Sequence, residues 1–247
     1  MAEKHFFEQQ KHTENYLIPY FDRHVPGWRE FRILEAGCAE AGLIDVLSHL
    51  GISVSGIELE RHRVDFVRKI NPGLDVQAGD ITDPELKRRF PEPFDLIILR
   101  DVIEHIPDRH AVFRNMRQLL KKGGFLFISF PPRFSPFGGH HQNGRSLLKH
   151  LPFLHLLPAG NIRWLGKLFH EQENVVESAI LNERIGLTVH RFEKLMREYQ
   201  FCPAVFECFI SRPVYRTRFG WRIVHFPNIP FLREFMTLGC ECLLKKQ

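Results

Sequence analysis

Short apolar segments alternate with amphipathic helical segments through the first half of this sequence. The segment at 94–102 is nearly all apolar in its first part, as expected of a strand that is buried on both faces. Such an alternation predicts a parallel sheet with right-handed crossovers and helices on both faces. The expected strands are 31–38, 52–59, 75–80, 94–102 and 124–131, and the expected helices are 41–51, 60–70, 81–90 and 108–124.

The alternation stops after residue 131. Residues 132–187 hold prolines, glycines, histidines and short helical patches, and this length is too great for a plain loop. We therefore expect an inserted helical lid or substrate-binding segment there. A helix at 188–200 and strands at 202–213 and 234–246 complete the sheet, with an aromatic-rich excursion at 214–233 between the two strands.

The N-terminal residues are expected to cover the domain. Residues 6–21 have amphipathic spacing and predict a helix that ends near Pro19, within a helical cover formed by residues 1–29. Because a proline in a helix removes one hydrogen bond and clashes with the preceding turn, it is a natural stop signal. The chain 1–247 is thus predicted to be a single α/β domain.

The composition excludes several broad classes of protein. Hydrophobic residues make up 44% of the 247 residues, which is too apolar for a disordered chain and enough for a core without disulfides. The five cysteines form no CxxC pair, which predicts reduced thiols and a cytoplasmic protein. We expect no signal peptide and no transmembrane segment. The net charge of +5 is spread along the chain, so nucleic-acid binding is not expected.

The segment LEAGCAEAG (34–42) joins the first expected strand to a helix through a glycine turn. Gly37 allows a ligand to approach the backbone closely, because it has no Cβ. The spacing from Gly37 to Gly42 differs from the GxGxxG of dinucleotide-binding proteins, which argues against an NAD enzyme. Glu35 precedes the glycine, and a carboxylate there suits an ammonium group better than a phosphate.

Two further acidic residues follow the next two strands. Glu58 ends the second strand, about where a ribose diol is held in related folds, and Asp80 with Ile81 ends the third. Either carboxylate could instead be solvated or could cap a turn. Because the carboxyl ends of parallel strands share one sheet edge, three acids there predict a pocket for a cationic nucleoside such as S-adenosylmethionine (SAM).

Five motifs together resemble the class I SAM-dependent methyltransferase superfamily, in particular its broad small-molecule branch, which includes ubiquinone-type O-methyltransferases. They are LEAGCAEAG, GIELE, AGDI, FDLIILRDVIEHIPD and LLKKGGFLFISFP, and they cover about residues 30–131. The resemblance implies a Rossmann-like, doubly wound sheet of seven strands with an antiparallel last strand. One departure is Ala39, which stands in place of the usual second glycine.

The resemblance also implies a set of cofactor contacts. Glu35 and Gly37 would face the methionine part of SAM, Glu58 the ribose, and Asp80 with Ile81 the adenine, while Arg100 to Val102 would border the sulfonium. The full expected set is Glu35, Gly37, Cys38, Ala39, Gly42, Glu58, Leu59, Asp80, Ile81, Arg100, Asp101 and Val102.

The expected reaction is transfer of the methyl group to a small-molecule acceptor, most readily a hydroxyl, with S-adenosylhomocysteine as product. An RNA methyltransferase and a non-catalytic SAM-binding protein are the alternatives. His105, His140 and His141 are the candidate catalytic residues, because a neutral imidazole near the methyl could take a hydroxyl proton. His105 could equally be structural, and many such enzymes need only alignment of the two reactants.

No metal is expected, but one arrangement is an alternative. Asp101, Glu104, His105 and His141 resemble the metal site of small-RNA 2′-O-methyltransferases and some ubiquinone O-methyltransferases, where a cation would lower the pKa of a hydroxyl. Those families carry glutamate where this chain has Asp101.

The acceptor pocket is expected to take shape from the insert and the later excursion. Their aromatic residues and arginines suit an anionic or aromatic acceptor, although a lid with its own small core would also explain them. The residues concerned are Phe134, Phe137, Trp164, Phe169, Tyr215 and Trp221, with Arg133, Arg145, Arg163, Arg216 and Arg218.

Overall fold

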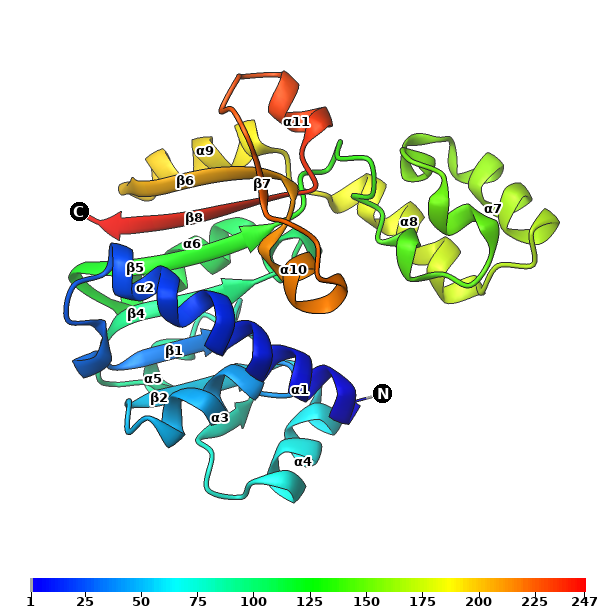
Figure 1. Ribbon diagram of the computed structural model, residues 1–247. Coiled ribbons are helices and arrows are strands. Elements are labelled where there is room, and N and C mark those ends of the chain that lie inside the picture. The colour runs from blue at the N-terminus through cyan, green and yellow to red at the C-terminus, as the bar shows by residue number, and fades with distance from the viewer. Residues whose placement is uncertain (1) are drawn as a thin grey trace.

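A computed structural model describes residues 2–247, and a sheet of eight strands forms its centre (Figure 1). The strand order is β3-β2-β1-β4-β5-β8-β6-β7. The first five of these are parallel, whereas β8 runs antiparallel to β5 and β6, and β7 runs antiparallel to β6. The strands are β1 (Ile33–Ala36), β2 (Val54–Glu58), β3 (Val76–Ala78), β4 (Phe94–Arg100), β5 (Leu120–Phe130), β6 (Phe201–Ser211), β7 (Val224–Phe226) and β8 (Gly239–Lys246).

The predicted doubly wound α/β fold is confirmed, with one strand more than expected. The extra strand is the short β7, which forms within the excursion 214–233 and pairs with the free edge of β6. The last strand β8 is antiparallel, as the resemblance implied, and it is inserted between β5 and β6.

Helices pack on both faces of the sheet, and successive residues of β4 point to opposite sides. Leu96 and Ile98 belong to one core with the N-terminal helices, whereas Ile97 and Leu99 belong to the other. Both cores exclude water from the strands, which explains the apolar run that was read from the sequence. The first core packs α3 (Gly42–His49) and α4 (Arg61–Ile70), and the second packs α5 (Leu86–Arg89), α6 (Arg109–Leu119) and α9 (Val189–Glu198).

The N-terminal helix continues past Pro19, so the expected stop there is wrong. Helix α1 (Ala2–His12) runs into a π-helical turn, η1 (Thr13–Leu17), and then into α2 (Ile18–His24). Pro19 lies in the first turn of α2, directly after the π-helical turn, and Leu17 and Ile18 before it keep helical dihedral angles. Figure 1 shows α1 and α2 crossing one face of the sheet, as a cover would.

Several boundaries differ from the sequence-based expectation. Helix α6 ends at Leu119 rather than near 124, because Leu120 already pairs with Phe94 in the sheet. Strand β8 begins at Gly239 rather than 234, because the preceding residues form the short helix α11 (Leu232–Met236). All five cysteines are free, and the first six residues of β8 are buried on both faces of the strand.

The insert 132–187 forms a separate layer of short helices. Its elements are η4 (His141–Asn143), η5 (Leu147–His150), η6 (Leu154–Leu156), α7 (Ala159–Leu168) and α8 (Glu173–Ile185). Helices α7 and α8 project beyond the sheet and share a small core of their own (Figure 1). Buried Arg109 ties this layer to the domain, because it donates to the carbonyls of Ile103, Glu104 and Ile185. Within the described residues no helix is both long and apolar enough to cross a membrane.

The turn between β1 and α3 holds two alanines in the left-handed region. Ala39 has φ 51° and Ala41 has φ 61°, a conformation that costs an L-residue roughly 1–2 kcal/mol and costs glycine almost nothing. Gly37, with φ 78°, is required for a further reason. A Cβ at this position would lie 2.5 Å from Cγ2 of Val102.

We expect Ala39→Gly to stabilise the protein by about 0.5–1 kcal/mol, because glycine relieves the left-handed strain at half-buried Ala39. The matched control is Ala111→Gly inside helix α6, which should destabilise by about 1 kcal/mol. Urea unfolding midpoints would measure both changes. A lower midpoint for Ala39→Gly would mean that packing of its methyl group outweighs the strain.

Candidate active site

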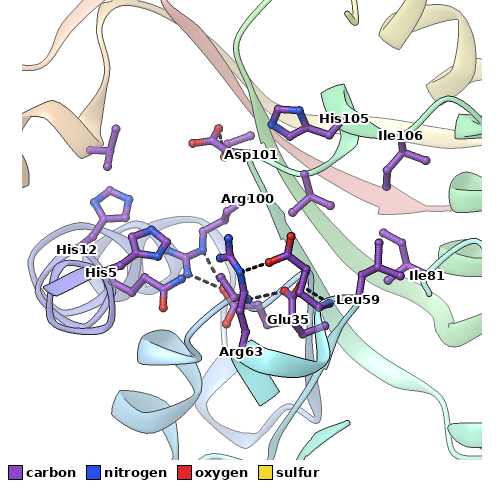
Figure 2. Close-up of a pocket in the computed structure, with 18 of the residues that line it drawn as sticks. His5, His12, Glu35, Leu59, Arg63, Ile81, Arg100, Asp101, His105 and Ile106 are labelled. Carbon is purple, nitrogen blue, oxygen red and sulfur yellow. Dashed lines mark hydrogen bonds and ion pairs between the residues drawn. The ribbon is translucent and has the colours of Figure 1, made fainter. Parts of the chain in front are cut away.

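A cavity of about 880 Å³ opens at the carboxyl ends of β1, β2, β3 and β4, beneath the N-terminal helix (Figure 2). Its position is the one where open parallel sheets bind ligands. The lining residues come from distant parts of the chain. They include His5, Gln9, His12, Glu35, Gly37, Ala39, Glu58, Leu59, Arg63, Asp80, Ile81, Arg100, Asp101, Val102, His105, Ser129, His140, Arg212, Tyr215 and Glu241.

Ten of the twelve residues expected to contact the cofactor line this cavity. Cys38 and Gly42 are the two exceptions. Cys38 is fully buried in the core. Gly42 faces helix α1, where an added Cβ would lie 2.4 Å from the carbonyl oxygen of Phe6. Gly42 therefore permits the close approach of the N-terminal helix, and Gln9 of that helix accepts a hydrogen bond from its N–H at 2.9 Å.

Glu35 ends β1 and is paired with Arg100, which ends β4. Nε of Arg100 donates to Oε1 of Glu35 at 3.1 Å, and Nη2 donates to the same oxygen at 2.5 Å. Oε2 of Glu35 is buried and has no hydrogen-bond partner among the described residues. Burial raises the pKa of Glu35, although the Arg100 guanidinium acts in the opposite direction. The free oxygen can accept from a cationic or N–H-bearing ligand.

Glu58 and Asp80 are held in place by the backbone around them. Glu58 accepts from the N–H of Ala39 at 2.8 Å and from the N–H of Glu60 at 3.0 Å. Asp80 accepts from the N–H and the hydroxyl of Thr82. Each carboxylate keeps lone pairs for a ligand. Beside them the apolar side chain of Leu59 is 66% exposed, so a ligand in the cavity could cover it.

Glu104, His105 and His140 form a cluster on one wall of the cavity. Nε2 of His105 lies 3.8 Å and Nε2 of His140 lies 3.9 Å from Oε1 of Glu104. Neither carboxylate oxygen of Glu104 has a hydrogen-bond partner among the described residues, nor has Nε2 of His140. Burial raises the pKa of Glu104 and lowers the pKa values of His105 and His140, so both imidazoles are neutral at pH 7.

The expected metal set is only partly brought together. Ligand atoms of Glu104, His105 and His140 all lie within 4.8 Å of one another and could hold a cation. His141 is not among the lining residues, because its Nε2 is hydrogen-bonded to the carbonyl of Leu151 at 2.8 Å. Asp101 is instead hydrogen-bonded by the Arg212 guanidinium. Burial would raise the pKa of Asp101, but this guanidinium holds it below the usual value.

The expected acceptor residues mostly lie elsewhere. Among the aromatic residues and arginines named from the sequence, only Tyr215 and Arg218 line the cavity, and the insert contributes His140 and Gln142. The Arg218 guanidinium is paired with Glu8 at 2.9 Å. Arg133 and Arg163 form ion pairs within the insert, with Glu183 and Glu177.

The wall beyond β4 was not foreseen from the sequence. His12 comes from α1, Ser129 from β5, Glu241 from β8, and Arg212 from the residue after β6. The hydroxyl of Tyr16 donates to Oε2 of Glu241 at 2.6 Å. No local motif marks these residues, because only the strand order β4-β5-β8-β6 places them side by side.

Comparisons with known proteins agree on one kind of domain. A family model described as a methyltransferase domain matches residues 6–172. The ubiquinone biosynthesis O-methyltransferase of Pseudomonas entomophila is 30% identical over 100 residues, which are 40% of this chain and 43% of the relative. The enzyme of the same name from Ralstonia nicotianae is 32% identical over 40% of this chain and 42% of the relative. The match thus spans less than half of each relative's length.

Solved structures share the fold. A SAM-dependent methyltransferase from Mesorhizobium loti superposes with a TM-score of 0.56 at 15% identity, covering 92% of this chain and 96% of the other. Magnesium protoporphyrin IX methyltransferase from Synechocystis, solved with bound S-adenosylhomocysteine, superposes with a TM-score of 0.53 at 13% identity. The match covers 97% of this chain and 84% of the other.

We expect Glu241→Gln to stabilise the protein above neutral pH. Burial raises the pKa of Glu241 to about 7, although Tyr16 and Arg212 oppose the shift, while Asp101 and Glu207 add to it. The native state therefore binds the proton of Glu241 more tightly than the unfolded chain does. The free energy of unfolding falls for this reason as the pH rises from about 4.5 through 7. The variant should gain up to about 3 kcal/mol at pH 8 and almost nothing at pH 4.

Urea unfolding of both proteins between pH 4 and pH 8 would measure this difference, with exposed Glu14→Gln as the control that should show no trend. A Glu241→Gln protein that is less stable than the parent at pH 8 would show that Arg212 stabilises the ionised form.

Proposed function

Since the chain belongs to the class I SAM-dependent methyltransferases, we propose that it transfers the methyl group of SAM to a hydroxyl of a small-molecule acceptor. SAM is the methyl donor of this family. The observation that carries the proposal is the meeting of Glu35, Glu58 and Asp80 in one cavity at neighbouring strand ends. Such an edge attracts a cationic nucleoside and repels a pyrophosphate.

In the proposed complex each carboxylate binds a different part of SAM. The free oxygen of Glu35 accepts from the ammonium of the methionine part, Glu58 accepts from the ribose hydroxyls, and Asp80 accepts from the adenine amine. Leu59 and Ile81 contact the adenine faces, which removes the exposed side chain of Leu59 from water. The cavity wall formed by Arg100 to Val102 then borders the sulfonium.

The Glu104–His105–His140 cluster is the proposed place where the acceptor hydroxyl is activated. A neutral imidazole can accept the hydroxyl proton directly. The alternative is a divalent cation held by Glu104, His105 and His140, which would lower the pKa of the hydroxyl. The unpartnered oxygens of Glu104 and the unpartnered Nε2 of His140 fit a cation, because each is a buried group that otherwise lacks a partner.

The other functions considered have less support. An RNA substrate would need a field of unpaired basic residues at the cavity mouth, whereas Arg63, Arg100, Arg212 and Arg218 of the cavity are all in ion pairs. A protein that binds SAM without catalysis would have no use for the buried, unpartnered cluster around Glu104.

We expect Glu58→Lys to weaken SAM binding at least about a hundredfold, because it replaces a hydrogen-bond acceptor with a charge that repels the sulfonium. The matched control is Asp65→Lys on the exposed face of α4, which should bind as the parent does. Isothermal titration with SAM and S-adenosylhomocysteine would measure both. Unchanged affinity in Glu58→Lys would place the cofactor elsewhere.

We expect His140→Ala to lower kcat by about 10²–10⁴-fold with little change in SAM affinity, because it removes a group from the proposed activation site. His150→Ala, at an exposed position of the same insert, is the control. Release of S-adenosylhomocysteine in the presence of acceptor measures the rate.

Dialysis against a chelator separates the two modes of activation. Loss of activity that is restored by Mg²⁺, Mn²⁺ or Zn²⁺ would indicate a cation, and unchanged activity would indicate the imidazole alone. If His105→Ala and His140→Ala both keep the kcat of the parent, the Glu104–His105–His140 cluster takes no part in the reaction.

A further inference from the structure

The cavity has a second half, which begins beyond β4. If the acid-lined half over β1, β2 and β3 holds SAM, as proposed above, the acceptor must lie in this other half. We call it the acceptor chamber and define it by His12, Ser129, Arg212, Tyr215 and Glu241. These residues come from the N-terminal helix, β5, the end of β6, helix α10 (Pro213–Phe219) and β8.

The walls of the acceptor chamber carry fixed hydrogen-bonding groups. The Arg212 guanidinium bonds to Asp101, and the hydroxyl of Ser129 lies 3.3 Å from the same carboxylate. Tyr16 donates to Oε2 of Glu241, and no described residue donates to its other oxygen. Nδ1 of His12 is 3.3 Å from the hydroxyl of Thr217. The chamber thus offers both donors and acceptors, and Arg212, Ser129, Glu241 and His12 are each oriented by a neighbour.

This lining disfavours an acceptor with a long apolar chain. Beside the five polar residues that define the chamber, the N-terminal helices, β5 and α10 add the apolar side chains of Leu17, Phe127 and Val214. An apolar ligand would take the polar groups out of water without replacing their hydrogen bonds, and this costs free energy at each group. An anionic acceptor is disfavoured too, because the Arg212 charge is already neutralised by Asp101.

Aromatic side chains lead from the acceptor chamber to the surface. The rings of Tyr215 and Trp221 are 5.8 Å apart, and those of Phe219 and Trp221 are 5.3 Å apart. Trp221 is 56% exposed and Phe219 is 60% exposed. The negative face of an aromatic ring attracts the partly positive C–H groups of a pyranose, so these rings can hold a sugar residue next to the one in the chamber.

Glu241 is a buried acid on the wall of the acceptor chamber, and Tyr16 donates to only one of its two carboxylate oxygens. It lies on a central strand with buried neighbours, and this burial raises its pKa, so an ionised carboxylate there costs folding free energy. Groups that reduce stability are retained where the function needs them.

From this geometry we propose that the acceptor is a polyhydroxylated molecule of the carbohydrate class, bound through its hydroxyls by Ser129, Arg212 and Glu241. In the reaction, a lone pair of one sugar hydroxyl forms a bond to the methyl carbon of SAM. The C–S bond breaks and leaves its electron pair on sulfur, which gives neutral S-adenosylhomocysteine. The hydroxyl proton passes to Nε2 of His140, which has no hydrogen-bond partner among the described residues.

Saturation-transfer NMR on the full-length protein loaded with S-adenosylhomocysteine tests this proposal. The probes are the methyl glycosides of glucose, galactose, mannose, rhamnose and fucose, set against catechol, hydroquinone and caffeate. We expect saturation transfer to at least one glycoside and to none of the phenols. Transfer to phenols alone, or to neither set while S-adenosylhomocysteine is bound, would overturn the carbohydrate assignment. Failure to bind S-adenosylhomocysteine would instead contradict the proposed function itself.

Two variants test the residues involved. Tyr215→Ala, which removes the aromatic ring that lines the chamber itself, should weaken the best glycoside about fivefold or more, whereas Phe231→Ala, an exposed aromatic residue outside the Tyr215–Phe219–Trp221 cluster, should not. Glu241→Leu should abolish the glycoside signal while the affinity for S-adenosylhomocysteine stays within twofold of the parent. If both variants bind the glycoside as the parent does, the acceptor chamber is not its site.

Discussion

The ion pair between Glu35 and Arg100 organises the whole cavity. It joins the ends of β1 and β4, the two strands at the centre of the parallel part of the sheet, and it is almost completely buried. A carboxylate placed there alone would be too costly to ionise. With Arg100 satisfying one of its oxygens, Glu35 can present the other to a ligand, and Arg100 separates the acid-lined half of the cavity from the acceptor chamber.

Several features around the cavity reduce the stability of the fold. Ala39 and Ala41 hold left-handed conformations, Glu104 is a buried carboxyl without a partner, and Glu241 resists ionisation. Elsewhere in the domain, apolar side chains are buried in two cores on the two faces of the sheet. Departures that gather at one place are typical of functional sites, where geometry is selected over stability.

The cofactor half of the cavity could be foreseen because it is local in sequence. Each of its acids ends a strand within a recognisable motif, and parallel strands bring such ends to one edge. The role of a residue could not be predicted where it depends on contact with a distant segment of the chain. Gly42 looks like a ligand-binding glycine, yet the approach of helix α1 accounts for it. His140 and His141 are indistinguishable in sequence, and only the fold of the insert turns one of them toward Glu104.

The α/β alternation, the parallel half of the sheet and the three acids at its edge could be predicted from the amino-acid sequence, since all of these follow from short-range periodicity and from the direction of the strands. The acceptor chamber could not be predicted in this way, because its walls come from residues more than a hundred positions apart, such as Ser129 and Glu241. Their proximity depends on β8 pairing between β5 and β6. This strand pairing depends on the packing of the whole sheet, and no local sequence pattern indicates it.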